Sequence, residues 1–237
     1  MKIPELSIVI PCYNEEKRLD KNFYVIYNYC LKNIKKFEII LVDDGSTDST
    51  PFMMMKHHDK NIKFITYTKN MGKGYAVKQG IMRAQYKHVL FMDIDSATPI
   101  NEIEKLYPYV NKYNVVIGSR EIEDSNIIVQ QPISRKVMGW VFRKMYYIIL
   151  GLKIRDTQNG FKLFETSTAQ FLFSQLTTNR WAFDIEILYL YIHRVFPSCK
   201  IKEVGITWIN DKDSRVNPIK DGIQMFIALL QIRFRHG

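Results

Sequence analysis

Short runs of apolar and β-branched residues alternate with helical patterns through the first half of the chain. Four of these runs are each followed by polar turn residues and a helical pattern, and Val115–Ile117 adds a fifth run. The four runs are Leu6–Ile10, Glu38–Val42, Ile62–Tyr67 and Val89–Met92. Strands that alternate with helices are typical of βαβ units. The pattern therefore predicts an α/β fold with a mostly parallel sheet that helices cover on both faces.

No internal repeat, low-complexity tract or linker divides the chain, so we expect a single domain over residues 1–237. The apolar run near the N-terminus is short and leads directly into strand-like sequence, which argues against a signal peptide. No uninterrupted apolar segment reaches the length of about 18 residues that a spanning helix needs. We therefore expect no membrane-spanning helix.

Polar clusters follow three of the predicted strands at the point where each strand ends. They are Pro11–Glu16, Asp43–Thr50 and Asp93–Asp95. The carboxyl ends of parallel strands share one edge of an open sheet, and ligands bind in the crevice there. The sequence therefore predicts one polar site that all three clusters build.

Asp93 and Asp95 can point in the same direction, because side chains alternate between the two faces of an extended segment. Two carboxylates suit Mg²⁺ or Mn²⁺, since these ions often bind through few carboxylates together with substrate phosphates. A solvated turn is the alternative, because Asp is common in turns. The position beside two other polar strand ends favours a metal site.

Composition and charge narrow the possible functions. The chain is 46% apolar and 13% aromatic, which is enough for a full core and excludes disorder as its main state. Its formal charge of +10 favours an anionic partner, which leaves nucleic acid, a phosphorylated substrate and an acidic membrane surface open. Three scattered cysteines are too few for a disulfide framework or a zinc site and indicate a reducing, cytosolic compartment.

Five motifs, in their order and spacing, resemble the nucleotide-sugar half of inverting family-two glycosyltransferases with the GT-A fold. They are Ser7–Glu16, Val42–Thr50, Lys69–Gly80, Met92–Pro99 and Ile117–Glu121. Arg155–Phe164 and Arg180–Leu188 resemble the branch that glycosylates dolichyl and polyprenyl phosphates, and they are less similar to dolichol-phosphate mannose synthase. The resemblance implies a Rossmann-like nucleotide-sugar half over residues 1–120 and an acceptor half over 121–237.

In such enzymes the first polar clusters bind the nucleotide. The resemblance places Pro11 and Tyr13 beside it, with Tyr13 against the base. Glu15 and either Asp43 or Asp44 would accept hydrogen bonds from base N–H or ribose hydroxyl groups. A helix start is the alternative for the second cluster, with a cap among residues 46–48, but it does not explain the two preceding aspartates.

Lys73 stands between two glycines and offers a cation where the backbone can approach a ligand closely. An ordinary glycine-rich turn is the alternative, and the rest of a Walker A loop is missing. Arg120, at the end of another predicted strand, could bind the donor diphosphate or the acceptor phosphate with its guanidinium fork. Arg135 follows a long loop, and we expect it to bind the acceptor phosphate unless it is merely solvated.

The resemblance assigns the remaining candidates to the sugar and the reaction. Asp156 and Gln158 would bind sugar hydroxyls. Asp184 corresponds to a carboxylate that acts as the general base in other inverting GT-A enzymes. The alternative is an acidic side chain that only interacts favourably with the N-terminus of a helix. Arg215 would lie over the diphosphate in a loop whose closure excludes water, unless it is a surface arginine.

Two basic segments rich in aromatic and apolar residues, Arg135–Lys153 and Ile219–Gly237, suit amphipathic helices at a membrane interface. Core helices with a basic exposed face are the alternative. We therefore expect a cytoplasmic protein that is peripheral on the cytosolic face of an anionic membrane, with a separate membrane subunit left open as an anchor.

The predicted reaction is metal-dependent, inverting transfer of a hexose from a nucleotide sugar to polyprenyl or dolichyl phosphate. The resemblance favours UDP-glucose, with GDP-mannose next. The nearer alternative is transfer to a soluble sugar or protein hydroxyl, for which Asp184 would be an obligatory base. The remote alternative is a basic RNA-binding module, and against it the carboxylates cluster where a nucleic acid backbone would be repelled.

Overall fold

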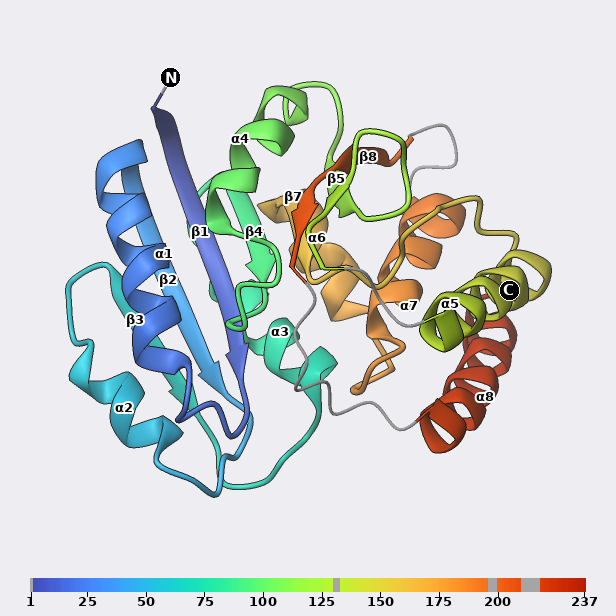
Figure 1. Ribbon diagram of the computed structural model, residues 1–237, viewed down its shortest axis with the longest axis horizontal. Coiled ribbons are helices and arrows are strands. Elements are labelled where there is room, and N and C mark those ends of the chain that lie inside the picture. Colours follow the sequence, from blue (N-terminus) through green and yellow to red (C-terminus); the bar gives the residue numbers. More distant parts are fainter. Residues whose placement is uncertain (1, 130–132, 196–199, 210–217) are drawn as a thin grey trace.

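The computed structural model describes residues 2–129, 133–195, 200–209 and 218–237. A seven-stranded sheet runs through the molecule in the order β3-β2-β1-β4-β7-β5-β8 (Figure 1). Its strands are β1 (Ile3–Cys12), β2 (Ile34–Asp43), β3 (Ile62–Thr66), β4 (His88–Met92), β5 (Val115–Ser119), β7 (Phe161–Glu165) and β8 (Lys202–Gly205). Two short strands, β6 (Asn126–Ile127) and β9 (Thr207–Trp208), pair separately.

All five predicted strands are present, and most neighbouring strands are parallel, as predicted. The exception is β7, which lies antiparallel between β4 and β5. The sequence analysis did not predict this strand. Its register places Phe161 opposite Met92, so that the residues before β7 lie beside the residues that follow β4.

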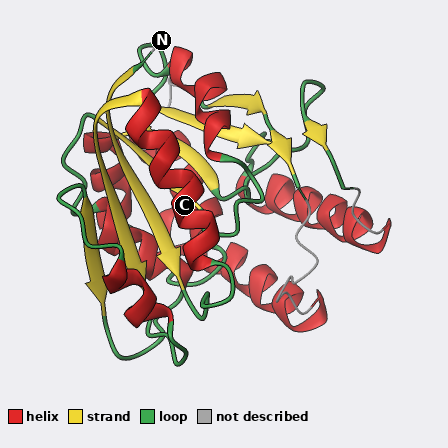
Figure 2. Cartoon of the chain, turned by 60° about the vertical axis from the view of Figure 1, so that its left-hand side comes forward, coloured by secondary structure: helices red, strands yellow, loops and turns green. Residues whose placement is uncertain are grey.

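Helices cover both faces of the sheet, as predicted (Figure 2). They are α1 (Leu19–Asn33), α2 (Thr50–Lys56), α3 (Lys73–Ile81), α4 (Ile103–Leu106), α5 (Ile133–Leu150), α6 (Thr166–Ser174), α7 (Phe183–Leu190) and α8 (Pro218–His236). Alternate strand residues point to opposite faces, as in any strand. Val9 and Ile40 therefore pack with α3, α6 and α7, whereas Ile8 and Ile39 pack with α1 and α4.

The two predicted amphipathic segments form α5 and α8, which lie side by side at the end of the molecule away from α1 and α2 (Figure 1). Each helix buries one side, as Tyr146 of α5 and Leu229 of α8 show. The other sides expose Ile133, Val137, Trp140, Val141, Tyr147, Ile148, Ile223, Phe226, Ile227 and Phe234. Within the described ranges, no helix combines the length and apolar character that crossing a bilayer demands.

Candidate active site

The polar clusters after β1, β2 and β4 meet at one edge of the sheet, as predicted. Parallel pairing of β1 with β2 places Cys12 opposite Asp43, and pairing of β1 with β4 places Val9 opposite Phe91. The residues that follow these strands therefore share the carboxyl edge. This is the crevice in which open α/β sheets bind ligands.

The two aspartates after β2 have different surroundings. Asp44 accepts hydrogen bonds from Tyr67 Oη at 2.8 Å, from the Met71 amide at 2.9 Å and from the Gly72 amide at 2.9 Å. Its oxygens therefore hold the segment before α3. Asp43 accepts hydrogen bonds from Ser46, including one from the Ser46 amide at 3.1 Å, and burial raises the pKa of Asp43 above its usual value. Of the two, Asp43 keeps more acceptor capacity for a ligand.

The loop after β1 is hydrogen-bonded to the start of α2. The Glu15 amide donates to Thr50 Oγ1 at 2.7 Å, and the Glu15 carboxylate forms an ion pair with Arg18. Pro11 lies within β1 and is partly buried, while the Tyr13 side chain is 37% exposed at this edge. The predicted cap position is wrong, because α2 begins at Thr50 and its N-cap is residue 49.

Lys73 and Asp93 form a tight ion pair at the centre of the site. The Lys73 ammonium lies 2.7 Å from Asp93 Oδ1 and 2.9 Å from Asp93 Oδ2, and it also lies 5.5 Å from the centre of the Trp181 ring. The backbone of Gly160 also packs against Asp93, because a Cβ atom on Gly160 would lie 2.0 Å from Oδ2. Only glycine permits this close approach of the segment before β7.

Asp95, the second predicted metal ligand, lies at the same edge of the sheet. Burial, together with the negative charge of Asp93, raises the pKa of Asp95 to about 6, while its Oδ1 accepts a bond from the Ala97 amide at 2.9 Å. The described residues hold no group of three or more potential metal ligands. Hard oxygen donors in this small number fit Mg²⁺ or Mn²⁺, which take their remaining ligands from water and substrate phosphate.

Asp184 lies in the first turn of α7 and is buried against Lys162 of β7. The Lys162 ammonium lies 2.6 Å from Asp184 Oδ1 and donates to the Asn159 carbonyl at 2.5 Å. Burial raises the pKa of Asp184, and the Lys162 charge opposes that rise. The sequence analysis missed Lys162. A lysine within the apolar run 161–164 was the available signal, because fully buried lysines are rare unless they are paired.

Arg120 follows β5 and is clamped by Asp156. Asp156 Oδ2 accepts bonds from Arg120 Nε at 2.7 Å and from the Arg120 amide at 2.9 Å, and Oδ1 accepts from Nη2 at 2.8 Å. Although burial opposes it, the Arg120 charge holds the pKa of Asp156 below its usual value. We predicted bonds from Asp156 to sugar hydroxyls. In the structure both Asp156 oxygens accept hydrogen bonds from Arg120, and the contact with the sugar stays a prediction.

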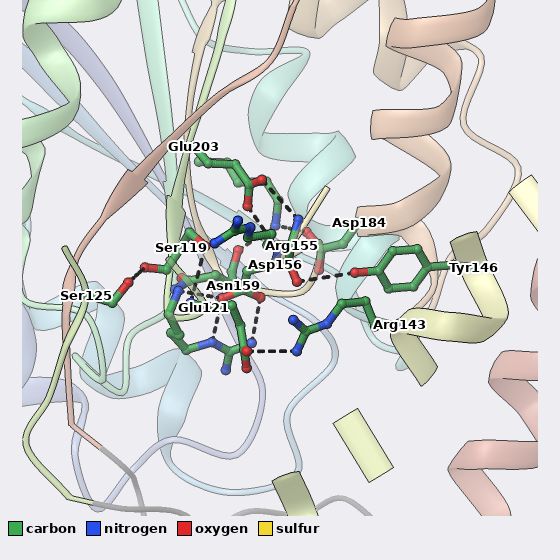
Figure 3. Close-up of polar contacts among 12 residues, drawn as sticks. Ser119, Glu121, Ser125, Arg143, Tyr146, Arg155, Asp156, Asn159, Asp184 and Glu203 are labelled. Atoms are coloured by element: carbon green, nitrogen blue, oxygen red, sulfur yellow. Dashed lines mark hydrogen bonds and ion pairs between the residues drawn. The ribbon is translucent and has the colours of Figure 1, made fainter. Parts of the chain in front are cut away.

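The segment that carries Asp156 is itself held from two sides (Figure 3). Glu203 of β8 accepts hydrogen bonds from the Arg155 amide at 3.0 Å and the Asp156 amide at 3.1 Å. Tyr146 of α5 donates its hydroxyl to the Ile154 carbonyl at 2.8 Å. Arg120 is therefore positioned by contacts from β5, β8 and α5 together.

The two glycines around Lys73 fit against the loop before α7. Gly72 has a φ of +105°, and a Cβ there would lie 2.5 Å from the Asn179 carbonyl oxygen. A Cβ on Gly74 would lie 2.6 Å from Phe183 Cβ. The glycine pattern therefore reflects close packing that brings Lys73 to Asp93.

Three predicted site residues are less well defined. Gln158 is half-buried and makes no hydrogen bond to another residue of the described segments. Arg135 lies in the first turn of α5, but its side chain is outside the described part of the chain. Arg215 also lies outside the described residues.

Comparison with known proteins identifies the family of the chain. The sequence profile of glycosyl transferase family 2 matches residues 7–173. The chain is 35% identical to the dolichyl-phosphate beta-glucosyltransferase of Homo sapiens, over 98% of this chain and 76% of the relative. It is 31% identical to the enzyme of that name from Saccharomyces cerevisiae, over 98% of this chain and 75% of the relative.

Solved structures show the same fold. Glucosyl-3-phosphoglycerate synthase from Mycobacterium tuberculosis, in complex with phosphoglyceric acid, matches with a TM-score of 0.72 and 16% identity, over 97% of this chain and 80% of that chain. The same enzyme with Mn²⁺, UDP-glucose and glycerol 3-phosphate matches with a TM-score of 0.69 and 16% identity, over the same shares of 97% and 80%. The predicted GT-A fold is thus confirmed. The chain belongs to glycosyl transferase family 2 and is a glycosyltransferase of the type that its dolichyl-phosphate beta-glucosyltransferase relatives represent.

Proposed function

We propose that this protein transfers glucose from UDP-glucose to dolichyl or polyprenyl phosphate, with inversion at the anomeric carbon. The observation that carries the proposal is the arrangement of charge at one sheet edge. The carboxylates of Asp93 and Asp95 lie where a donor and its cation would bind, and the clamped Arg120 lies near α5. The near full-length similarity to dolichyl-phosphate beta-glucosyltransferases supports this choice of donor and acceptor.

On the donor side, residues 1–120 supply the nucleotide-sugar half of a single domain. Tyr13 stacks on the base and Asp43 accepts hydrogen bonds from the base or ribose, with Glu15 nearby. Lys73 holds Asp93 in place, and Asp95 is the carboxylate that binds Mg²⁺ or Mn²⁺. When bound, the cation neutralises the diphosphate and so makes it a better leaving group. Gln158 and Arg215 complete the contacts to sugar and diphosphate.

On the acceptor side, Arg120 and Arg135 bind the lipid phosphate. An oxygen of this phosphate forms the new bond to the anomeric carbon while the bond to the donor diphosphate breaks, and UDP leaves. The acceptor is already an anion near neutral pH, so it needs no strong base. Asp184, paired with Lys162, orients the reacting groups rather than removing a proton.

The exposed apolar sides of α5 and α8, together with the net charge of +10, support binding at the cytosolic surface of an anionic membrane. The acceptor would then be presented from the lipid phase, next to α5. A separate membrane subunit could strengthen this attachment.

The test is transfer of labelled glucose from UDP-glucose to dolichyl phosphate in mixed micelles, with Mn²⁺, Mg²⁺ or EDTA. We expect lipid-linked product with either ion and none with EDTA, a weaker signal with GDP-mannose, and no product from Asp95→Asn. Product from a hydroxyl acceptor alone would move the enzyme to the other acceptor class. Full activity of Asp95→Asn would remove Asp95 from the donor site.

A further inference from the structure

A second arginine, Arg143 of α5, reaches the segment that follows β5. Its Nη2 lies 2.7 Å from Glu121 Oε2, and Glu121 is the residue directly after Arg120 (Figure 3). Two arginine–acid pairs, Arg120 with Asp156 and Arg143 with Glu121, therefore lie at the same strand end. From the sequence, Arg143 was expected only as one basic residue of the membrane-interface segment 135–153, and Glu121 had no assigned role.

The two pairs differ in how firmly the acid is held. The Asp156 side chain is 3% exposed and makes three bonds to Arg120, so it is a permanent partner. The Glu121 side chain is 46% exposed, and its contact to Arg143 is a single short one. Exposed ion pairs contribute little stability. A stronger anion can therefore displace Glu121 from Arg143 far more easily than Asp156 from Arg120.

The backbone that carries Arg143 is fixed relative to Arg120. Tyr146 lies three residues further along α5, on the same side of the helix as Arg143. Its hydroxyl donates to the carbonyls of Ile154 at 2.8 Å and Arg155 at 3.3 Å, directly before Asp156. The contact thus ties this side of α5 to the segment that clamps Arg120.

We propose that Arg143 joins Arg120 in binding the acceptor phosphate, and that Glu121 occupies Arg143 until that phosphate displaces it. This inference rests on the proposed function and identifies a further residue of its acceptor site. A phosphate monoester carries a charge of about −1.5 to −2 near neutral pH, more than the single charge of a carboxylate, and its oxygens match the guanidinium fork. The exposed Trp140 and Tyr147 on α5 give the attached lipid an apolar surface beside this site.

Three variants test the proposal: Arg143→Gln, Glu121→Gln and, as the matched control, Lys144→Gln, which also removes one positive charge from α5. Initial rates are measured against dolichyl phosphate concentration at saturating UDP-glucose. We expect Arg143→Gln to raise the KM for dolichyl phosphate about tenfold or more, because a charge-assisted hydrogen bond is lost. Glu121→Gln should lower this KM, and Lys144→Gln should leave it unchanged. The KM for UDP-glucose should stay unchanged in all three variants.

Arg143→Gln and Glu121→Gln should change the KM for dolichyl phosphate in opposite directions, and this distinguishes acceptor binding from a merely structural ion pair. A structural pair would give both variants the same direction of change, together with a matching loss of thermal stability. That result, or an unchanged acceptor KM in Arg143→Gln, would overturn the proposal.

A binding measurement keeps this test independent of turnover. Tryptophan fluorescence is followed while dolichyl phosphate, phosphatidic acid or inorganic phosphate is added to the protein in neutral micelles. We expect Arg143→Gln to weaken dolichyl phosphate binding about tenfold and Glu121→Gln to tighten it. Equal weakening for phosphatidic acid would indicate a general lipid-headgroup site and refute an acceptor site. Binding that follows these signs without any glucose transfer would contradict the proposed function alone.

Discussion

Replacing Lys162 by Met is the sharpest test of the charges inside the site. Methionine keeps an unbranched apolar chain in β7 but removes the ammonium group that lies 2.6 Å from Asp184 Oδ1. The side chains of the pair are only 2% and 5% exposed, so water cannot replace the lost partner. The Asp184 carboxylate would be left buried and unpaired.

The expected cost follows from this burial. Removing one partner of a buried ion pair lowers the free energy of unfolding by about 3–5 kcal/mol, a large part of the total of about 5–15 kcal/mol for a typical domain. The same replacement in an Asp184→Asn background leaves neither charge of this pair, so we expect it to cost much less. The difference between the two costs measures the coupling of the pair.

The cost should also depend on pH, and its sign is fixed. Burial already raises the pKa of Asp184, and loss of Lys162 would raise it further. The folded protein then binds a proton more tightly than the unfolded chain. The resulting stability is fully present below the unfolded pKa and is lost as pH rises through the folded pKa. The deficit of Lys162→Met should therefore be largest near neutral pH and should shrink as pH falls.

Urea unfolding of the four proteins in this cycle, near neutral pH and at about pH 5, measures these quantities. A deficit of less than about 1 kcal/mol, typical of an exposed pair, would refute the buried-pair interpretation. A deficit that is equal at both pH values would show that Asp184 does not carry the penalty.

Three further outcomes are expected. Gly160→Ala should lower the apparent affinity for UDP-glucose and cost about 1–3 kcal/mol of stability, since its Cβ would press on Asp93. Thermal unfolding and titration with UDP-glucose measure these two effects. Gly139→Ala is the control, because a Cβ there meets nothing within 4 Å. Asp156→Asn should raise the KM for dolichyl phosphate by releasing Arg120. Because the pKa of Asp156 is lowered, its stabilising effect is present above the ordinary pKa of 3.8 and is lost as pH falls through the folded pKa. The free energies of unfolding of the wild-type protein and Asp156→Asn should therefore become equal in acid. Unfolding curves that stay apart in acid would contradict this. The protein should sediment with anionic but not neutral vesicles and be released by salt, because each basic group near an anionic membrane surface contributes about 1 kcal/mol to binding. Equal recovery with both kinds of vesicle would leave α5 and α8 without a membrane role.

The sequence was sufficient to predict the parallel part of the sheet and the edge where the site forms. Strands β1, β2 and β4 are apolar runs that end in polar residues, and such runs are recognisable without tertiary context. Asp93 and Asp95 lie at the predicted edge of the sheet because they come one and three residues after the end of β4. The positions of site residues can therefore be predicted from local sequence pattern where these residues directly follow a strand.

The antiparallel strand β7 was not predictable in the same way. It follows an irregular segment and carries Lys162 within an apolar run, so the run indicates neither a strand direction nor a partner. Its insertion between β4 and β5 places Gly160 against Asp93 and Lys162 against Asp184. These contacts join residues that are far apart in the sequence, and spacing alone does not reveal them.

Hydrogen-bond partners within the protein, more than residue type, distinguish the acids that serve the fold from those that can serve a ligand. Asp44 and Asp156 resembled ligand-binding acids, but both are buried and their oxygens are used by backbone amides or by Arg120. A carboxylate held in this way would lose several charge-assisted bonds in order to bind a sugar hydroxyl. Asp95 and Glu121 hold fewer bonds within the described structure, so a cation or an incoming phosphate can change their state at little cost. We therefore expect ligands to act on carboxylates that have few partners, while Asp44 and Asp156 hold the segment before α3 and Arg120 in position.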